Sequence, residues 1–210
     1  MSPLPVHPVP GAFDVTRPHP ARMYDFYLGG KDHWQADRQA AEQILAVAPE
    51  VRAIARANRA FLRRAVTYLA KEKGVTQFLD IGTGIPTSPN VHETAAAHAT
   101  GTRVAYADND PVIHAHANAL LTGTGTTKII LADLRDPETI LVGARDFLDF
   151  TKPVTLLLVA VLHFIPDTED PAGIVAAFRD ALPPGRARGR GRRKPAERRA
   201  LLHSSAQAPA

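Results

Sequence analysis

Three aspartates stand where strands of a parallel sheet are expected to end. Asp80 lies two residues before a glycine turn, Asp108 follows the run 104–107, and Asp133 follows the run 129–132. An acid beside a glycine turn repels a pyrophosphate but suits a ligand with an ammonium or sulfonium group. Carboxylates after the next two strands can accept hydrogen bonds from ribose hydroxyls and from an adenine amino group. Each acid alone more often caps a helix or lies in a solvated turn, but three in succession predict a positively charged nucleoside ligand.

The turn Gly82-Thr83-Gly84 follows the first expected strand. Glycines at such a place let the backbone turn tightly and approach a ligand, although a G-x-G pattern also occurs in plain strand-to-helix turns. The dinucleotide fingerprint needs a third glycine three residues after the second, where this chain has Thr87 preceded by Pro86. The pattern therefore disfavours a pyrophosphate cradle.

Four apolar runs that are separated by helical stretches indicate strands joined by crossover helices. The last run is apolar almost throughout, as expected of a strand covered on both faces. The predicted fold is therefore α/β, with a doubly wound, mostly parallel, Rossmann-like sheet. The runs are Gln77–Ile81, Arg103–Ala107, Lys128–Ala132 and Val154–Leu162.

Four dipeptides after these strands predict helix starts. In each, an oxygen-bearing side chain at the N-cap precedes a proline at the first helical position, where no amide is left unpaired. The dipeptides are Asp110-Pro111, Asp136-Pro137, Asp170-Pro171 and Ser88-Pro89.

The N-terminal part of the chain differs from the rest in composition and in its hydrophobic pattern. Six prolines in residues 1–20 predict an extended, poorly ordered lead-in. A short aromatic helix that stops at Gly29-Gly30 is expected next, followed by helices over 33–48 and 49–73. The expected division is a lead-in at 1–20, a helical extension at 21–74, a ligand-binding α/β domain at 75–185 and a disordered basic tail at 186–210.

The positive charge of the chain is concentrated in the tail. The formal charge of the whole chain is +4, but residues 186–210 hold eight basic residues and one acid, so residues 1–185 are mildly acidic. Binding to nucleic acid by counterion release needs clustered Lys and Arg. The body therefore gives no reason to expect a nucleic-acid partner.

Several classes of protein are disfavoured by residues that the sequence lacks. There is no cysteine, which excludes disulfides, thiolate metal sites and cysteine nucleophiles. No apolar run reaches the roughly 18 residues that span a bilayer, and no signal-peptide pattern begins the sequence. The nine histidines show no metal-ligand spacing. We therefore expect a cytoplasmic protein without a membrane partner or a metal.

Six segments within residues 13–185 resemble one bacterial family of S-adenosylmethionine-dependent methyltransferases, formerly a domain of unknown function. The strings LDIGTG, IPT, NVHE and DNDP occur in this order and carry the resemblance, which implies the class I methyltransferase fold. The segments are ARMYDFYLGGKDHW, NRAFLRRAVTYL, QFLDIGTGIPTSPNVHE, RVAYADNDPVIHAHANALL, ADLRDPETIL and LLLVAVLHFIPD. Pro86 stands where a glycine is common in the wider class, and we interpret IPT as this family's own version of the motif.

The resemblance implies S-adenosyl-L-methionine as the cofactor and assigns roles to individual residues. Those implied to line its methionine and sulfonium part, and the acceptor pocket, are Asp80, Gly82, Thr83, Gly84, Ala160 and Val161. Those implied to hold the adenosine are Asp108, Asn109, Asp133 and Leu134. Those implied to contact the ligand from a closing segment are Arg22, Tyr24 and Gly30.

The activity implied is methyl transfer to an unidentified, small-molecule acceptor. In-line displacement needs chiefly alignment, and a base only if the acceptor must lose a proton. His163 is the first candidate base because it follows the strand whose end faces the methyl group, although a histidine bonded to a backbone carbonyl is an equal alternative. Two other functions stay open: a protein that binds the cofactor without turnover, and a protein that binds or modifies nucleic acid through the basic tail.

The residues after Gly185 do not resemble the family. Seventeen of these 25 residues are Arg, Ala, Gly or Pro, all with GC-rich codons, which predicts a frameshifted or truncated product. A real disordered basic tail is the alternative. Under the first hypothesis the sheet is incomplete at its C-terminal side, the last strand has a bare apolar edge, and we expect marginal stability and weak or absent activity.

Overall fold

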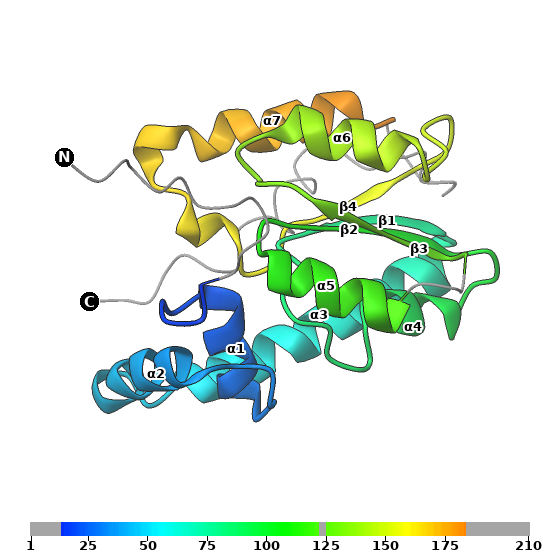
Figure 1. The fold of residues 1–210 in the computed structure, drawn as a ribbon. Coiled ribbons are helices and arrows are strands. Elements are labelled where there is room, and N and C mark those ends of the chain that lie inside the picture. Colours follow the sequence, from blue (N-terminus) through cyan, green and yellow to red (C-terminus); the bar gives the residue numbers. More distant parts are fainter. Residues whose placement is uncertain (1–13, 122–124, 184–210) are drawn as a thin grey trace, which may run out of the picture.

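The computed structural model describes residues 14–121 and 125–183; the predicted tail and most of the predicted lead-in lie outside the described residues. Four strands form one sheet in the order β3-β2-β1-β4, and every neighbouring pair is parallel. Helices cover both faces of the sheet (Figure 1), which confirms the predicted doubly wound α/β class. The strands are β1 (Gln77–Ile81), β2 (Arg103–Asp108), β3 (Thr127–Leu131) and β4 (Thr155–Leu157).

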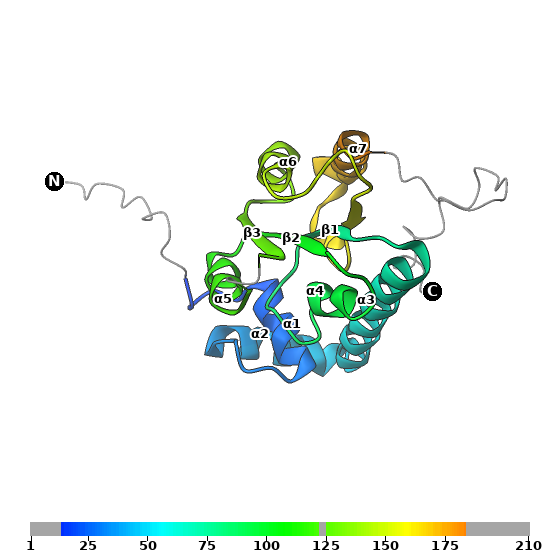
Figure 2. The same cartoon turned by 90° about the vertical axis from the view of Figure 1, so that its right-hand side faces the viewer.

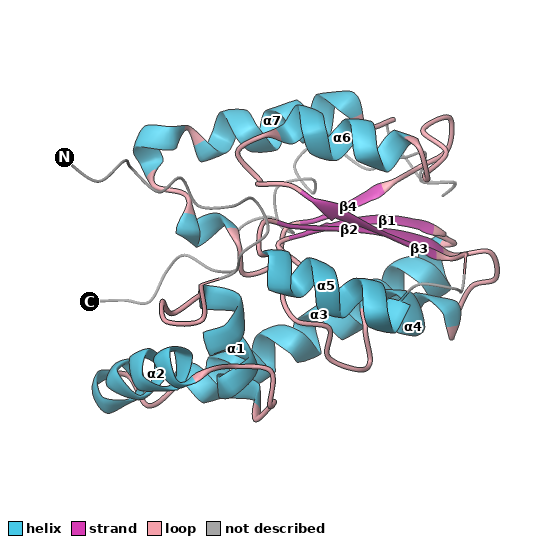
Figure 3. Cartoon of the chain, viewed as in Figure 1, coloured by secondary structure: helices cyan, strands magenta, loops and turns pink. Residues whose placement is uncertain are grey.

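Seven α-helices and two short 3-10 helices are described in these ranges (Figure 3). None of these helices is both long enough and apolar enough to cross a bilayer. The α-helices are α1 (Pro20–Leu28), α2 (Gln35–Val47), α3 (Val51–Lys73), α4 (Val91–Ala96), α5 (Pro111–Leu121), α6 (Pro137–Arg145) and α7 (Pro171–Ala181). The 3-10 helices are η1 (Leu162–Phe164) and η2 (Asp167–Glu169).

Two apolar cores lie on opposite faces of the sheet, because successive side chains of a strand point to opposite sides. Leu79 and Ile81 of β1 pack on the side of α6 and α7, with Phe178 of α7 fully buried. Phe78 of β1 packs on the other side, with Val66 of α3 and residues of α4 and α5. Figure 2 shows the two helical layers above and below the sheet.

The N-terminal helices form a third, smaller cluster. Tyr27 of α1, Ala41 of α2 and Ala55 of α3 are its buried members. Gly29 ends α1 and Gly74 ends α3, both with left-handed backbone torsions (φ 85° and 64°) that favour glycine at a helix C-terminus. The long helix α3 belongs to this cluster and to the sheet core, and so joins the two.

The strand predicted over Val154–Leu162 is wrong in its length. The ladder contains only Thr155–Leu157, which pair with Phe78–Asp80 of β1. The last pair is Asp80 with Leu157, and the later residues of the run have no ladder partner in the described chain. Ala160 instead adopts a left-handed torsion (φ 55°), and the chain continues into η1. The apolar residues beyond the ladder pack on the two cores rather than extend the strand.

Three of the four predicted N-caps are found in the structure. Asp110, Asp136 and Asp170 each accept a hydrogen bond from a backbone N–H two or three residues further on. The fourth prediction, at Ser88-Pro89, is wrong. That peptide bond is cis, and α4 begins after Asn90, whose capping box with Glu93 satisfies the first amides.

A buried side-chain bond holds β1 to the segment that leads into β4. The Gln77 amide donates to the Asp149 carbonyl at 2.9 Å and accepts from the Asp149 N–H at 2.7 Å. The two residues are 72 positions apart in the sequence. Gln77 therefore holds the segment that precedes β4 against β1, ahead of the first paired residues of the two strands.

We predict that Phe178→Ala lowers the free energy of unfolding by about 3–5 kcal/mol, because it removes a fully buried ring and leaves a cavity. Urea denaturation measures the change. Phe164→Ala is the matched control, since this ring is 49% exposed and its loss is expected to change stability little. Equal effects of the two substitutions would show that α7 does not pack as described.

Candidate functional site

The loop after β1 turns at two glycines with left-handed torsions. Gly82 has φ 70° and Gly84 has φ 66°, values that L side chains rarely adopt. The Gly82 N–H donates to the Ala107 carbonyl at 2.8 Å, which joins the loop to the end of β2. A Cβ on Gly82 would lie only 2.4 Å from Val161 Cγ2. The predicted glycine turn and the segment after β4 are therefore packed directly against each other.

Asp80 is a buried acid at the carboxyl end of β1. Burial raises its pKa to about 7, because the charged form loses its water, and the nearby Arg59 guanidinium offsets part of that effect. The Thr83 hydroxyl faces Asp80 Oδ2 at 3.4 Å. A cationic group placed beside Asp80 would replace the lost hydration and favour the ionised carboxylate.

Asp108 joins the end of β2 to the glycine loop. Its Oδ2 accepts from the Gly84 N–H at 2.9 Å and its Oδ1 accepts from the Asp110 N–H at 3.0 Å. Burial nevertheless raises the pKa of Asp108, and these two donors only reduce the effect. The carboxylate therefore orients both the loop and the first turn of α5.

Asn109 and Asp133 meet across the ends of β2 and β3. The Asn109 amide donates to Asp133 Oδ2 at 2.8 Å, and the Arg135 N–H donates to Oδ1 at 2.8 Å. Partial burial raises the pKa of Asp133, but these donors and the Arg135 guanidinium together bring it below its usual value. Leu134 beside them is buried and belongs to the core. This end of the site is a negative, partly open edge.

Arg22 lies under the site rather than facing open solvent. It is 3% exposed, and its Nε donates to Asp37 Oδ1 of α2 at 3.1 Å. Its Nη1 lies 3.7 Å from Asp110 Oδ2, and its Nη2 donates to the Arg17 carbonyl at 2.7 Å. Arg22 therefore links the N-terminal helices to the end of β2.

A hollow of about 320 Å³ lies between the start of α1 and the start of α5. Two buried polar atoms in its wall, His19 Nδ1 and Asp110 Oδ2, lie 3.2 Å apart but have no well-formed hydrogen bond among the described residues. Asn109, which the resemblance places beside the adenine, also lines it. The lining residues are Asp14, Arg17, Pro18, His19, Arg22, Asn109, Asp110 and Pro111.

Two other residues predicted to contact the ligand have protein partners in the structure. The Tyr24 hydroxyl donates to the Ala55 carbonyl of α3 at 3.0 Å and accepts from the Asn58 amide at 2.9 Å. Gly30 is packed so tightly on Asp25 that a Cβ would lie 1.9 Å from its Oδ1. The structure thus uses Tyr24 and Gly30 to hold α1 in place, and a ligand contact by either stays a prediction.

The segment after β4 supplies the remaining predicted residues. Val161 contacts Gly82, as described above, and Ala160 is exposed beside it. His163 lies in η1 with an exposed side chain, and its ring centroid is 4.0 Å from that of Phe164. Desolvation lowers the pKa of His163, so its neutral form predominates at pH 7. A role as base stays a prediction.

Sequence reasoning missed Arg59. Its guanidinium Nη2 donates to the Thr87 carbonyl at 2.6 Å, which places the charge over the loop after β1. The sequence does hold a signal that Arg59 faces the protein. Arg59 stands three residues before Leu62 and seven before Val66, and both of these residues are buried. An arginine in register with a buried helix face is aimed at the protein rather than at solvent.

No group of three or more His, Cys, Asp or Glu side chains is placed to hold a metal ion in the described part of the chain.

The chain is similar to proteins of known family and structure. A family model described as S-adenosyl methyltransferase matches residues 7–189. A DUF574 family protein from Streptomyces avermitilis MA-4680 is 45% identical with a TM-score of 0.78, and the match covers 81% of this chain and 66% of that one. A protein from Thermobifida fusca YX, provisionally assigned as a methyltransferase, is 44% identical with a TM-score of 0.78, at 86% and 68% coverage.

This chain thus spans about two thirds of the length of each of these two solved chains. No curated protein matches it.

We predict that Gly82→Ala destabilises the protein by about 2–4 kcal/mol, through the left-handed torsion and the contact with Val161. Gly101→Ala separates the two causes, since Gly101 has the same φ of 70° but nothing within 4 Å of an added Cβ. The control is expected to lose only about 1–2 kcal/mol in urea denaturation. Equal losses would mean that Val161 does not press on the loop.

We predict that Asp80 makes the protein less stable as the pH rises. Its folded pKa of about 7 exceeds the ordinary value of 3.8, so the folded state keeps a proton that the unfolded state releases. The stability from this group is complete below pH 4 and is lost as the pH rises through 7. Urea denaturation at pH 5 and pH 8 should show a larger fall for the wild type than for Asp80→Asn. Identical falls would contradict the prediction.

Proposed function

We propose that this chain, which belongs to the S-adenosyl methyltransferase family, binds S-adenosyl-L-methionine and transfers its methyl group to a small-molecule acceptor. The observation that supports this most strongly is the buried Asp80 beside the glycine turn, with its pKa raised to about 7. A sulfonium or ammonium group beside this acid would stabilise its ionised form, whereas an anionic ligand would be repelled by it.

The other residues of the sheet edge fit the rest of the ligand. Gly82 leaves no room for a side chain, whereas a Cβ added at Gly84 would come no closer than 3.9 Å, to Ala21 Cβ. Asp108 and the Asn109–Asp133 pair provide oxygens at the ends of β2 and β3, suited to ribose hydroxyls and an amino group. The donor set therefore fits an adenosyl ligand with a positive charge at its other end.

The cofactor would supply an activated methyl group that leaves by in-line displacement. The protein's own residues then have three tasks: to fix the angle of approach, to exclude water and, for some acceptors, to remove a proton. Val161 and the glycine loop would border the reacting end. His163, neutral at pH 7 and at the exposed rim, is the residue we propose as proton acceptor. A cytoplasmic location and the nature of the acceptor stay predictions.

We expect isothermal titration of the purified chain with S-adenosylmethionine and S-adenosylhomocysteine to show binding. Asp108→Asn should weaken it by about tenfold or more, since hydrogen bonds to charged groups are worth about 1.5–3 kcal/mol. Asp180→Asn is the matched control, because this acid of α7 is exposed and pairs with Arg179. Absence of heat at millimolar ligand would overturn the proposal.

Turnover distinguishes the proposed enzyme from its alternative. Formation of S-adenosylhomocysteine with a panel of small-molecule acceptors would support methyl transfer. Tight binding without product for every acceptor would instead favour a protein that only binds the cofactor.

A further inference from the structure

Arg59 differs from the other arginines near the strand ends in its lack of a carboxylate partner. Arg22 has Asp37 and Asp110 within ion-pair distance, and Arg135 has Asp133 and Glu169. For Arg59, no acid of the described residues lies within 4 Å of the guanidinium; its hydrogen bond goes to the neutral Thr87 carbonyl. Its charge therefore lacks a close counter-ion.

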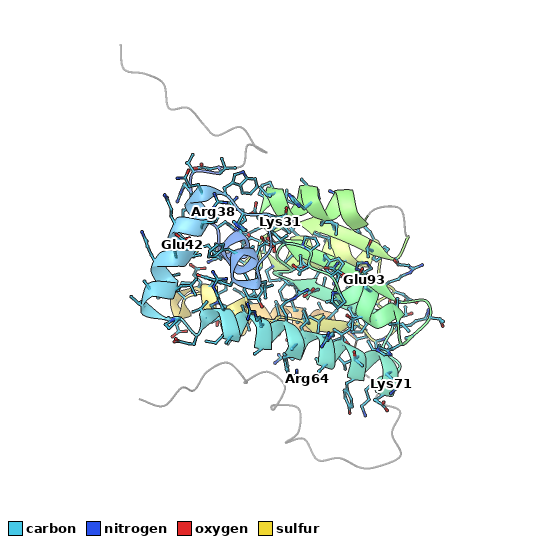
Figure 4. The ribbon with its side chains drawn as sticks, turned by 90° about the horizontal axis from the view of Figure 1, so that it is seen from below. Lys31, Arg38, Glu42, Arg64, Lys71 and Glu93 are labelled. Atoms are coloured by element: carbon cyan, nitrogen blue, oxygen red, sulfur yellow. The ribbon has the colours of Figure 1, made fainter. Side chains whose placement is uncertain are left out.

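The position of Arg59 directs that charge toward the site. Its guanidinium lowers the pKa of Asp80 through space, and it also acts on Tyr24 and Tyr106. Arg64 and Lys71 of the same helix behave differently, since both project from the outer side of α3 (Figure 4). Arg59 thus places a positive charge of α3 over the loop that follows Asp80.

We propose that Arg59 and Asp80 together recognise the α-amino acid end of the ligand, with Arg59 binding the carboxylate and Asp80 binding the ammonium group. This rests on the proposed function. A guanidinium presents paired donors that match a carboxylate, and a carboxylate accepts from an ammonium group. Asp80 precedes the glycine turn and Arg59 bonds to Thr87, which follows it, so the two opposite charges match those of a zwitterion. Arg59 is then a specificity-determining residue that rejects adenosyl ligands without a carboxylate.

The competing interpretation gives Arg59 a purely structural role, in which it holds the loop after β1 through its hydrogen bond to the Thr87 carbonyl. Arg59→Gln separates the two interpretations, because it removes the charge, so that its effects on ligands with and without a carboxylate can be compared. A structural role would affect all adenosyl ligands alike. A role in recognition would affect only those that carry a carboxylate.

We test this with three ligands: S-adenosylhomocysteine, its decarboxylated analogue, and 5′-methylthioadenosine, which lacks the amino acid part. In titration calorimetry, Arg59→Gln should weaken the binding of S-adenosylhomocysteine by at least about tenfold. The other two affinities should change less than about threefold. Asp80→Asn should lower the affinity for both ligands that carry the amino group and leave the affinity for 5′-methylthioadenosine little changed.

Arg63→Gln is the matched control, since Arg63 is exposed one turn further along α3; all three affinities should stay unchanged. The melting temperature of each variant verifies that it is folded. Equal weakening of all three ligands by Arg59→Gln, or no weakening, overturns the proposal. If the wild type binds none of the three, the proposed function fails instead, so the two failures are distinguishable.

Discussion

Arg22 carries a positive charge that the fold removes almost completely from water. Its guanidinium lies between Asp37 of α2 and Asp110 at the start of α5, and the Trp34 ring covers it with its centroid 5.2 Å from the guanidinium carbon. A buried charge is costly unless its partners are in place, so α1, α2 and the end of β2 must assemble together. The apolar cluster of these N-terminal helices is small, and the ion pairs therefore decide where the helices sit relative to the sheet.

The same polar connection continues into the site. Asp110 donates its N–H to Asp108, and Asp108 accepts from Gly84, so the buried charge cluster and the glycine loop are joined through one carboxylate. Asp80 and Asp108 both have raised pKa values, which means that their burial is not fully compensated by the protein. Acids of this kind are typical of sites that await a ligand. The two apolar cores on the sheet faces supply the stability that such a site requires.

Local patterns in the sequence were sufficient to predict the strands, the three Asp-Pro caps and the acids at the strand ends, because each depends on residues close together in the chain. The length of β4 was not predictable from its apolar composition, since the pairing stops at Leu157 opposite Asp80 and the apolar residues beyond it pack on the cores instead. Ser88 looked like a cap, but Asn90 and Glu93 form the capping box instead. The helical register of Arg59 indicates that it faces the protein, but the partners of Arg22 and Arg59 are brought together by the fold and no local pattern reveals them.

The bond between Gln77 and Asp149 has a consequence for how the site forms during synthesis. β1 is central to the sheet, yet both of its neighbours follow it in the chain, and the segment that joins β4 comes 72 residues later. Pairing over such a separation carries a loop-closure penalty and is slow compared with helix formation. The N-terminal helices can therefore emerge from the ribosome and form early, whereas Asp80 keeps an open flank until residue 157 has been translated. The ligand-binding edge therefore matures later than the N-terminal helices.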